Sequence, residues 1–377
     1  MWHRGLILPS HVKRRCDELV TRAQRATDVA AVFEAASPRL SRIVPLDAAA
    51  WMATDPATGL CMAPMRLENL TPRAESIEHE FRADDVNKFR DLARAQIPVG
   101  TLLAATGGRP TRSARYRQFH QSDFSDELRA VLRIGDSHWG NVSLLRAHGR
   151  SPFSERDVAI MASLSGPLAL ALRGCARVDP RTWPGSKVGA GLLLFGPAGE
   201  LVSINDEARH WLAQLPDTGG VGSPGLSGPH EIELPPWLAS TVLRARSAAM
   251  AGDAAEAWGR VVSPSGRWLV CDASCLRDAN GAITGTALVI APARSADLAP
   301  IIVEAYELTD REQQVTQLIA RGASTAEIAD DLYLSTHTVR HHIKAVFEKL
   351  GVSSRGELVA KLFAEHQLPA IASTPAR

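Results

Sequence analysis

Residues 308–362 read LTDREQQVTQLIARGASTAEIADDLYLSTHTVRHHIKAVFEKLGVSSRGELVAKL, and this stretch decides the fold of the C-terminal end. Thr309 and Glu312 have the spacing of a capping box, in which each side chain bonds a backbone N–H that the first helical turn leaves free. Ser324 and Glu327 repeat that spacing, and Ser335 stands where it can cap a third, longer helix. The spacing therefore predicts helices that begin directly after Thr309, Ser324 and Ser335.

Glycines and apolar spacing mark the ends and the inner faces of these helices. Gly322 and Gly351 follow the first and third helices, where a left-handed residue commonly ends a helix. Ser354 and Glu357 give a third capping-box spacing, which predicts a fourth short helix. On the third helix an apolar stripe follows the helical period, and its members are Val339, Ile343, Val346, Phe347 and Leu350.

Inward packing of that stripe leaves the opposite face of the third helix in solvent. The side chains expected there are Thr336, Thr338, Arg340, His341, Lys344 and Lys349. Such side chains suit the major groove of DNA, because arginine bonds a guanine edge bidentately, while lysine, histidine and threonine reach bases or phosphates. The alternative is the solvated face of an ordinary helical bundle. Three cap signals at helix-turn-helix spacing favour DNA binding over that alternative.

The same residues resemble the LuxR-type helix-turn-helix regulators. The resemblance rests on Leu308-Thr309-x-Arg311-Glu312, Ser324-Thr325-x-Glu327-Ile328-Ala329, Ser335-x-x-Thr338-Val339-x-x-His342 and Lys349-Leu350-Gly351-Val352-Ser353-Ser354-Arg355-x-Glu357-Leu358. It implies that the third helix enters the major groove, where Arg340, His341 and Lys344 meet bases. It implies that His342 lies against the phosphate backbone or within the helix packing. It also implies a homodimer in which the fourth helix pairs with its copy, with Glu357, Leu358 and Lys361 near the interface.

The charge of this segment lacks the excess of basic residues that favours DNA binding. From Leu308 to Glu365 seven Lys or Arg stand against eight Asp or Glu. Because basic residues drive sequence-independent DNA binding, the count predicts modest affinity and reliance on dimerisation. The near-neutral charge also supports a second hypothesis, a protein-interaction or scaffold module whose helix-turn-helix does not bind DNA.

Three histidines on the third helix raise the question of a metal site. His337 and His341 lie one helical turn apart, a spacing that can chelate zinc. A third ligand is missing nearby in the sequence, so the DNA-facing role is favoured over a metal. We expect no metal and no cofactor.

The remaining five sixths of the chain must hold the regulatory input. The chain has 377 residues, a formal net charge of +1 and a hydrophobic share of 45%, as in an ordinary globular protein of two or three domains. Apolar stretches such as Gly189 to Phe195 are too short to cross a bilayer, and the N-terminus lacks a convincing signal peptide. These features predict a cytoplasmic protein without a membrane partner. Nucleophile-elbow, Walker and zinc-protease motifs are absent from the sequence, so we expect no enzyme.

Residues 187–292 carry the order of elements of a PAS domain, which they resemble. Strands are predicted at Gly191 to Phe195 and Leu201 to Ile204, followed by a helix capped by Asn205 and a second helix from Pro236 to Ala251. Three further strands form a meander that turns at residues 264–266 and 278–281. Cys271 and Cys275 fall on its inward face and are interpreted as core residues.

Residues 11–175 resemble a GAF domain. The resemblance rests on Trp139-Gly140-x-Val142-x-Leu144 and Phe153-Ser154-x-x-Asp157-Val158. The pattern predicts one helix over 11–36, strands at 48–53 and 61–67, and one charged helix over 75–95. Further strands are predicted at 99–104, 127–134 and 138–145, before a last helix that starts at Ser154.

Together these predictions describe a multidomain α+β chain. Two antiparallel-sheet sensor domains, GAF-like (11–175) and PAS-like (187–292), precede an all-α four-helix helix-turn-helix domain (302–367). Such sensor domains enclose small apolar cavities suited to a small-molecule effector. The candidate lining residues are Trp51, Met52, Met62, Met65 and Phe119 in the first domain, and Trp211, Trp258 and Trp268 in the second. The alternative is that these side chains simply fill the cores. Double-stranded DNA, a small-molecule effector and a second copy of the chain are thus the expected partners.

Overall fold

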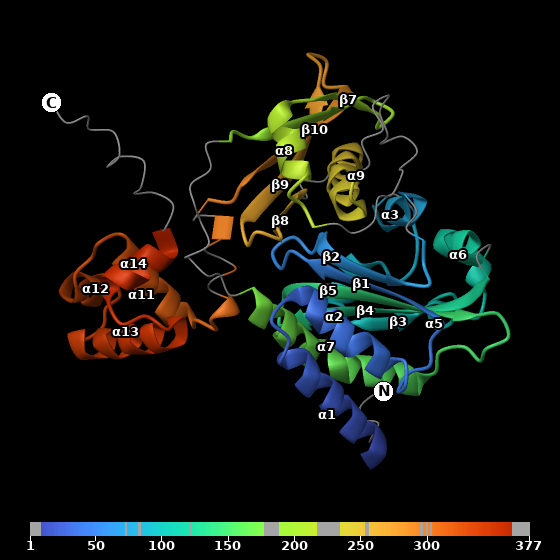
Figure 1. The fold of residues 1–377 in the computed structure, drawn as a ribbon, viewed down its shortest axis with the longest axis horizontal. Helices are drawn as coiled ribbons and strands as arrows, with labels where there is room; N and C mark the ends of the chain where they lie inside the picture. Colours follow the sequence, from blue (N-terminus) through green and yellow to red (C-terminus); the bar gives the residue numbers. More distant parts are fainter. Residues whose placement is uncertain are drawn as a thin grey trace. The chain divides into compact units, whose positions relative to one another are not determined.

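The computed structural model describes residues 9–71, 74–81, 84–120, 123–176, 188–216, 234–252, 256–294, 297–298, 301 and 304–363. They form two compact units. The N-terminal unit contains two five-stranded antiparallel sheets, and the C-terminal unit, which includes the chain from Pro292 onward, is helical. Figure 1 shows both units.

The first sheet has the strand order β2-β1-β5-β4-β3. Its strands are β1 (Ala48–Thr54), β2 (Cys61–Glu68), β3 (Val99–Thr101), β4 (Phe124–Ile134) and β5 (Ser137–Ala147). Its helices are α1 (Ser10–Gln24), α2 (Val29–Leu40), α3 (Ala74–Phe81), α4 (Phe89–Arg94), α5 (Leu102–Ala105), α6 (Ala114–Phe119) and α7 (Glu155–Cys175), with a 3-10 turn at Pro110–Arg112. The strands predicted at 48–53, 61–67, 127–134 and 138–145 are thereby confirmed.

Local hydrogen bonds break two helices that the sequence pattern predicts as continuous. The helix expected over 11–36 ends at Gln24, because Asp28 caps a new helix by accepting from the amide of Ala31 at 2.8 Å. The helix expected over 75–95 is interrupted by Asn87, whose φ of 54° is left-handed and whose side chain donates to the carbonyl of Thr101. The strand expected over 99–104 stops at Thr101, which caps α5 instead.

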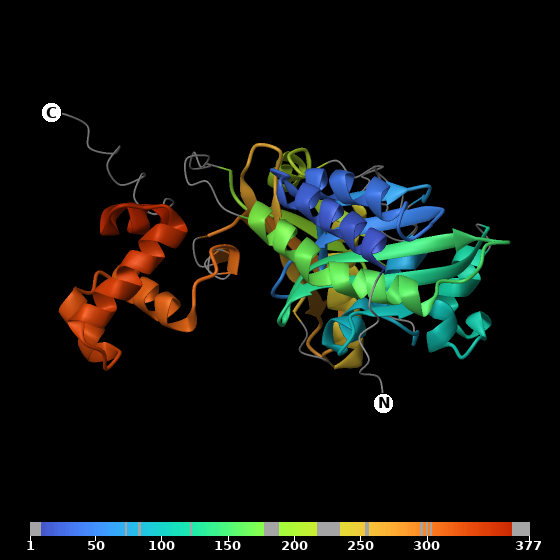
Figure 2. The ribbon, with the colours of Figure 1, turned by 90° about the horizontal axis from the view of Figure 1, so that it is seen from below.

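The two faces of the first sheet differ in what covers them. Helices α1, α2 and α7 pack together on one face (Figures 1 and 2). Trp51 points to that side, is fully buried beside Phe33, and donates to the hydroxyl of Ser37. Because side chains alternate along a strand, the next residue, Met52, faces the opposite side. Helices α3, α4, α6 and, from the second sheet, α9 gather on that opposite side.

Helix α7 is the one described helix whose length and composition would allow it to cross a membrane, with a mean hydropathy of 1.5. In this fold its apolar residues, among them Ile160, Leu164 and Leu168, are buried against β4 and α1. The length and apolarity of α7 are therefore those of a core helix, and the last helix that the sequence predicts from Ser154 is confirmed.

The second sheet repeats the connectivity of the first. Its order is β7-β6-β10-β9-β8, so in both sheets two strands are followed by helices and then by three strands. The elements are β6 (Gly191–Phe195), β7 (Leu201–Ile204), α8 (Asp206–Leu212), α9 (Pro236–Ala251), β8 (Trp258–Val262), β9 (Trp268–Arg277) and β10 (Ile283–Pro292). Asn205 caps α8 as predicted, and Cys271 is fully buried while Cys275 is partly buried.

The two sheets share a core, which the division into separate domains did not suggest. Met62 and Ala63 of β2 are buried in the core cluster of the second sheet. Beside them Asp55 and Arg260 form a bidentate ion pair, with Asp55 oxygens 2.7 Å from both Nε and Nη2 and both side chains 0% exposed. The hydroxyl of Thr58 also donates to the carbonyl of Trp258. The N-terminal unit is therefore built around contacts that join both sheets.

His138 supports the loop that carries Asp55. Its carbonyl accepts from the Thr54 hydroxyl at 2.6 Å, and its Nε2 lies 2.6 Å from the side-chain oxygen of Asn141. Burial lowers the pKa of His138 from 6.5 to about 4, although the Asn141 hydrogen bond acts in the opposite direction. Between those pH values His138 is protonated in the unfolded chain but not in the folded chain. The free energy of unfolding therefore falls as the pH falls.

We therefore expect acidification to destabilise the N-terminal unit through this residue. Lowering the pH from 6.5 to about 4 should remove up to about 3 kcal/mol of unfolding free energy. Denaturant unfolding of the full chain at several pH values measures this loss. His138→Gln should flatten the dependence, whereas His11→Gln, at an exposed site, should leave it unchanged. If the unfolding free energy of His138→Gln depended on pH as strongly as that of the parent, the role of His138 would be contradicted.

The C-terminal unit consists of α11 (Asp310–Ala320), α12 (Thr325–Asp331), α13 (Thr336–Leu350) and α14 (Arg355–Phe363). Capping boxes begin α11 at Thr309 and α12 at Ser324, and Ser335 caps α13, as predicted. Ser354 accepts from the Glu357 amide, but the Glu357 carboxylate bonds Ser353 rather than Ser354, so the third box is only half formed. Gly351 ends α13 with a φ of 62°.

The inner face of α13 is narrower than the apolar stripe predicts. Val339, Val346 and Leu350 are buried, together with Val315, Ile319, Ile328 and Leu358 of the neighbouring helices. Ile343 and Phe347 are only partly buried and line a surface groove. The expectation that these two residues belong to the core is corrected, because α11, α12 and α14 cover only part of the stripe.

Candidate nucleic-acid interface and ligand pocket

One face of α13 presents a row of polar side chains to solvent. Thr336, Arg340 and Lys344 follow one another at intervals of four residues, and His337 and His341 lie beside them, all exposed. Lys344 is 76% exposed, and its Nζ lies 3.8 Å from Glu348, a contact too long and too exposed to hold the lysine. Within the described residues no ion pair engages Arg340. Two cations are therefore available on this face.

Other residues predicted for DNA contact have partners inside the unit. Lys349 lies 2.6 Å from the carboxylate of Glu312 and donates to the carbonyl of Glu307 at 2.8 Å. Burial alone would raise the pKa of Glu312, but the hydrogen bond from Lys349 holds it below its ordinary value. Lys349 thus ties α13 to α11 although the residue remains exposed, and its predicted contact with DNA stays a prediction. Thr338 and His342 are half-buried, and the Thr338 hydroxyl lies 2.8 Å from that of Ser335.

The three residues predicted at a dimer interface all make contacts within their own chain. Leu358 is fully buried in the core of the unit. Lys361 donates to the carbonyl of Leu350 at 2.5 Å and lies over the ring of Tyr306, while Glu357 bonds Ser353. Leu358 therefore cannot contact a second copy of the chain unless α14 detaches, because the buried apolar face of α14 holds this helix to the unit.

The structure also reveals two exposed residues beside α13 that the sequence predictions did not include. Tyr333 is 95% exposed at the turn before α13, where its φ of 54° is left-handed. His337, considered only as a metal ligand, lies on the same exposed face as Arg340. An aromatic residue in a polar turn directly before a helix cap is the signal that would have identified Tyr333.

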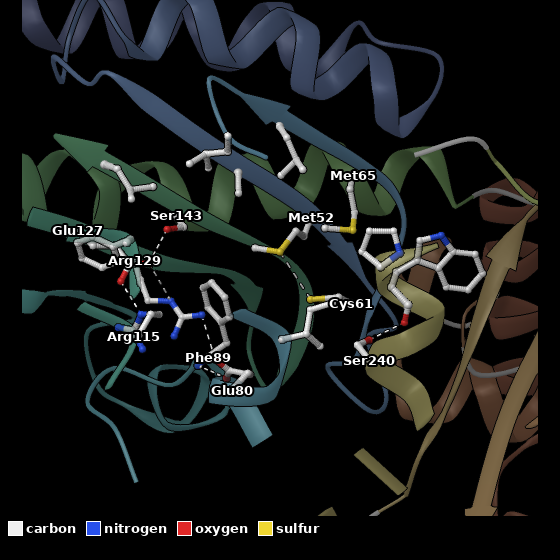
Figure 3. A pocket seen from close by; sticks show the side chains of 18 of the residues that line it. Met52, Cys61, Met65, Glu80, Phe89, Arg115, Glu127, Arg129, Ser143 and Ser240 are labelled. Carbon is white, nitrogen blue, oxygen red and sulfur yellow. Dashed lines mark hydrogen bonds and ion pairs between the residues drawn. The ribbon is translucent and has the colours of Figure 1, made fainter. Parts of the chain in front are cut away.

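A separate pocket lies in the N-terminal unit, on the face of the first sheet opposite α1, α2 and α7. Its volume is about 200 Å³. Apolar side chains make most of the wall, and they come from β1, β2, α3 and α6; they include Met52, Met65, Leu67, Ile77 and Phe119. Trp237 and Ser240 of α9 line it from the side of the second sheet, and Figure 3 labels Ser240. The pocket is thus lined by both halves of the unit.

The other end of the pocket is polar, and its charged side chains are nearly buried. Arg115 Nε lies 2.6 Å from Glu127, and Arg129 Nη2 lies 2.9 Å from Glu80. The Ser143 hydroxyl donates to Glu127, and the Arg129 guanidinium stacks 3.6 Å above the centre of the Phe89 ring (Figure 3). Burial works against the charge on Glu127, but Arg115 and Arg129 keep its pKa below the ordinary value. Glu127 is therefore ionised and paired.

Cys61 contributes the one thiol of the pocket wall. Burial raises the pKa of Cys61 to about 11, although the hydrogen bond from Asn141 opposes this rise. Because the thiolate is the reactive form, a thiol that stays protonated at neutral pH is a poor nucleophile. The pocket is therefore suited to non-covalent binding.

The predicted lining residues divide between this pocket and the cores. Met52, Met65 and Phe119 line the pocket. Trp51 faces the other side of the sheet, and Met62 is buried in the core of the second sheet. Trp211 is fully buried in that same core, with Nε1 donating to the carbonyl of Gly189, and Trp258 bonds Glu256. Trp268 is also buried, so Trp211 and Trp268 fill the interior as the alternative interpretation held.

Comparison with known proteins identifies the C-terminal unit. The family described as "Bacterial regulatory proteins, luxR family" matches residues 306–362. The chain is 44% identical over 55 residues to the spore germination protein GerE of Bacillus subtilis, which covers 15% of this chain and 74% of GerE. It is 45% identical over 58 residues to the transcriptional regulatory protein DesR of the same organism, which covers 15% of this chain and 29% of DesR. The chain thus spans less than a third of the length of DesR.

Solved structures give a weaker likeness over longer shares of the chain. A Vibrio cholerae VqmA dimer in the absence of target DNA has 17% identity and a TM-score of 0.21, covering 46% of this chain and 82% of VqmA. The sensor region of a sensor histidine kinase has 17% identity and a TM-score of 0.19, covering 76% of this chain and 93% of that region. Likeness at this level establishes no common fold.

Proposed function

The chain belongs to the luxR family of bacterial regulatory proteins, and from this premise we propose that it is a sequence-specific DNA-binding transcription regulator controlled by a small molecule. The observation that carries the proposal is the exposed face of α13, directly after a helix-turn-helix bend, where Arg340 has no ion pair with any described residue and Lys344 is 76% exposed. The luxR family match covers this segment, residues 306–362, and DesR and GerE match the chain over 58 and 55 residues. DesR is named a transcriptional regulatory protein.

We assign the roles on α13 from chemistry and exposure. Arg340 is proposed to bond a guanine edge, His341 and Lys344 to donate to bases or phosphates, and Thr336 to reach a phosphate. His337 and Tyr333 extend the same exposed surface. Lys349 is left out, because its ion pair with Glu312 serves the packing of α11 against α13. Thr338 and His342 are proposed to support the helix rather than to read bases.

The N-terminal unit is proposed to be the regulatory input. We propose a GAF-like segment over 11–175 and a PAS-like segment over 187–292, supported in each by two strands, helices and three further strands. The DNA-binding segment is proposed to span 302–367. The pocket between the first sheet and α9 is the proposed effector site. We further propose that the regulator acts in the cytoplasm.

We expect Arg340→Ala and Lys344→Ala each to weaken binding to a selected operator by about 1 to 3 kcal/mol, because each removes a contact to base or phosphate. A gel shift at fixed salt measures the loss. Arg311→Ala is the matched control, since Arg311 is an exposed arginine at the start of α11. Equal affinity of the Arg340→Ala variant and the parent would refute its role. Absence of any DNA binding by the parent would favour the protein-interaction hypothesis.

We also propose that the regulator binds DNA as a homodimer. One α13 helix with few basic contacts is too small for tight specific binding, and two-fold proteins read half-sites about one helical turn apart. The full chain should bind an inverted repeat cooperatively and a single half-site weakly. Footprinting combined with analytical ultracentrifugation tests this. A monomer that protects one half-site with high affinity would overturn it.

A further inference from the structure

The effector pocket described above has a composition that restricts the chemistry of its ligand. Its polar end holds two guanidinium groups, Arg115 and Arg129, opposite two carboxylates, Glu80 and Glu127. Their side chains are 5% to 16% exposed. A charged ligand would face a set of charges that already neutralise one another. Because removing a ligand charge from water is costly without a partner of opposite sign, this end disfavours ions of either sign.

Two buried atoms at this end nevertheless lack a hydrogen bond. Among the described residues, neither Arg129 Nε nor Glu80 Oε2 has a hydrogen-bond partner, although Glu80 Oε2 lies 2.9 Å from Arg129 Nη2 and Arg129 Nε lies 3.6 Å from Glu127 Oε1 in their ion pairs. Arg129 Nε is a donor and Glu80 Oε2 is an acceptor. Buried polar atoms in folded proteins are rarely left without a partner, so each such atom calls for an explanation. Both atoms are closed to solvent in the structure, so a hydroxyl group that accepts from the first and donates to the second must part the Arg129–Glu80 ion pair.

The remainder of the pocket selects for size and apolarity. A cavity of about 150 Å³ lined by apolar side chains accommodates benzene, and this pocket has a volume of about 200 Å³. Met52, Met65 and Phe119 give it flexible and aromatic walls suited to a ring or a short chain. The neutral Cys61 thiol adds no charge. The pocket therefore fits a molecule slightly larger than a single aromatic ring.

We propose that the ligand is a compact, uncharged alcohol or phenol, whose hydroxyl lies between Arg129 and Glu80 and whose apolar body extends towards Ser240 of α9. This rests on the proposal that the N-terminal unit senses a small molecule, and it adds the chemical class of that molecule. Since α9 belongs to the second sheet, the ligand contacts both halves of the unit. Occupancy of the pocket is thereby linked to the packing of the second sheet.

The test compares four probes of one framework with the full chain: phenylpropanol, propylbenzene, phenylpropanoate and phenylpropylammonium. Calorimetry and the shift in Tm report binding without DNA. Phenylpropanol should bind at least about tenfold more tightly than each of the other three, a difference of about 1.4 kcal/mol. Equal or tighter binding of either charged probe would overturn the neutral class. Equal binding of propylbenzene would overturn the role of the hydroxyl, and absence of phenylpropanol binding at millimolar concentration would overturn the proposal.

Two variants locate the binding in this pocket. Met52→Trp fills the apolar end and should abolish phenylpropanol binding, whereas Met250→Trp, at a 68% exposed position of α9, is the matched control and should bind normally. Ser240→Leu fills the pocket from the α9 side and decides the matter if Met52→Trp does not fold. Normal binding by a folded pocket variant would place the ligand elsewhere and overturn the proposal.

Failure of the wider function is distinguished by measuring operator affinity with and without phenylpropanol. Binding in the pocket without any effect on DNA affinity would leave the ligand class in place and contradict regulation by this route. Operator binding by a chain that binds none of the four probes would contradict the ligand class alone.

Discussion

Asp55→Ala is expected to destabilise the N-terminal unit by about 3 to 5 kcal/mol, because it leaves the Arg260 guanidinium buried beside an empty position. Both side chains are 0% exposed, and the Asp55 carboxylate accepts from Nε and Nη2 of Arg260 and from its backbone amide. Typical domains are stable by only about 5 to 15 kcal/mol, so a loss of this size should be seen as a large fall in Tm.

The effect should reach both sheets, since Asp55 precedes β2 and Arg260 lies in β8. Thermal unfolding followed by circular dichroism measures the loss, and hydrogen exchange resolves it by element. Asp136→Ala, at an exposed aspartate, is the matched control. The double variant Asp55→Ala with Arg260→Met should recover part of the stability, because it removes the buried guanidinium charge that has lost the Asp55 carboxylate. An Asp55→Ala melt identical to that of the parent would contradict the role of this ion pair.

Leu350→Ala should destabilise the C-terminal unit by about 2 to 5 kcal/mol, the usual cost of truncating a buried leucine. Leu350 is 1% exposed at the end of α13, in the core formed with α11 and α14. Phe347→Ala should cost less, since Phe347 is partly exposed beside a surface groove. The two variants therefore compare a core position with a rim position on the same helix.

Hydrogen exchange on the full chain is the suitable measurement, because it reports the amides of α11 to α14 separately from the N-terminal unit. Leu350→Ala should accelerate exchange throughout these helices and lower operator affinity indirectly. Lys344→Ala should lower operator affinity with exchange unchanged, since its side chain is 76% exposed. A larger effect of Phe347→Ala than of Leu350→Ala would contradict the burial of the two residues in the structure.

The sequence by itself determined the C-terminal helices and their starting points. The caps at Thr309, Ser324 and Ser335 are confirmed because a cap is a contact between residues three apart, which spacing alone reveals. Four strands of the first sheet were likewise predicted from the sequence, whereas the strand expected over 99–104 stops at Thr101. The helix break at Asp28 is equally local, but it was hidden within a continuous helical pattern.

Only the tertiary structure decided which side chains meet across long distances in the sequence. Lys349 and Lys344 are alike in the sequence, yet Glu312 lies across from the first, while the second faces solvent. Met52 lines the pocket and Met62 enters the core of the second sheet because different elements pack on each side of β1 and β2. Asp55 and Arg260 are 205 residues apart, and the partner of a buried charge depends on the packing of whole sheets, which no local pattern encodes.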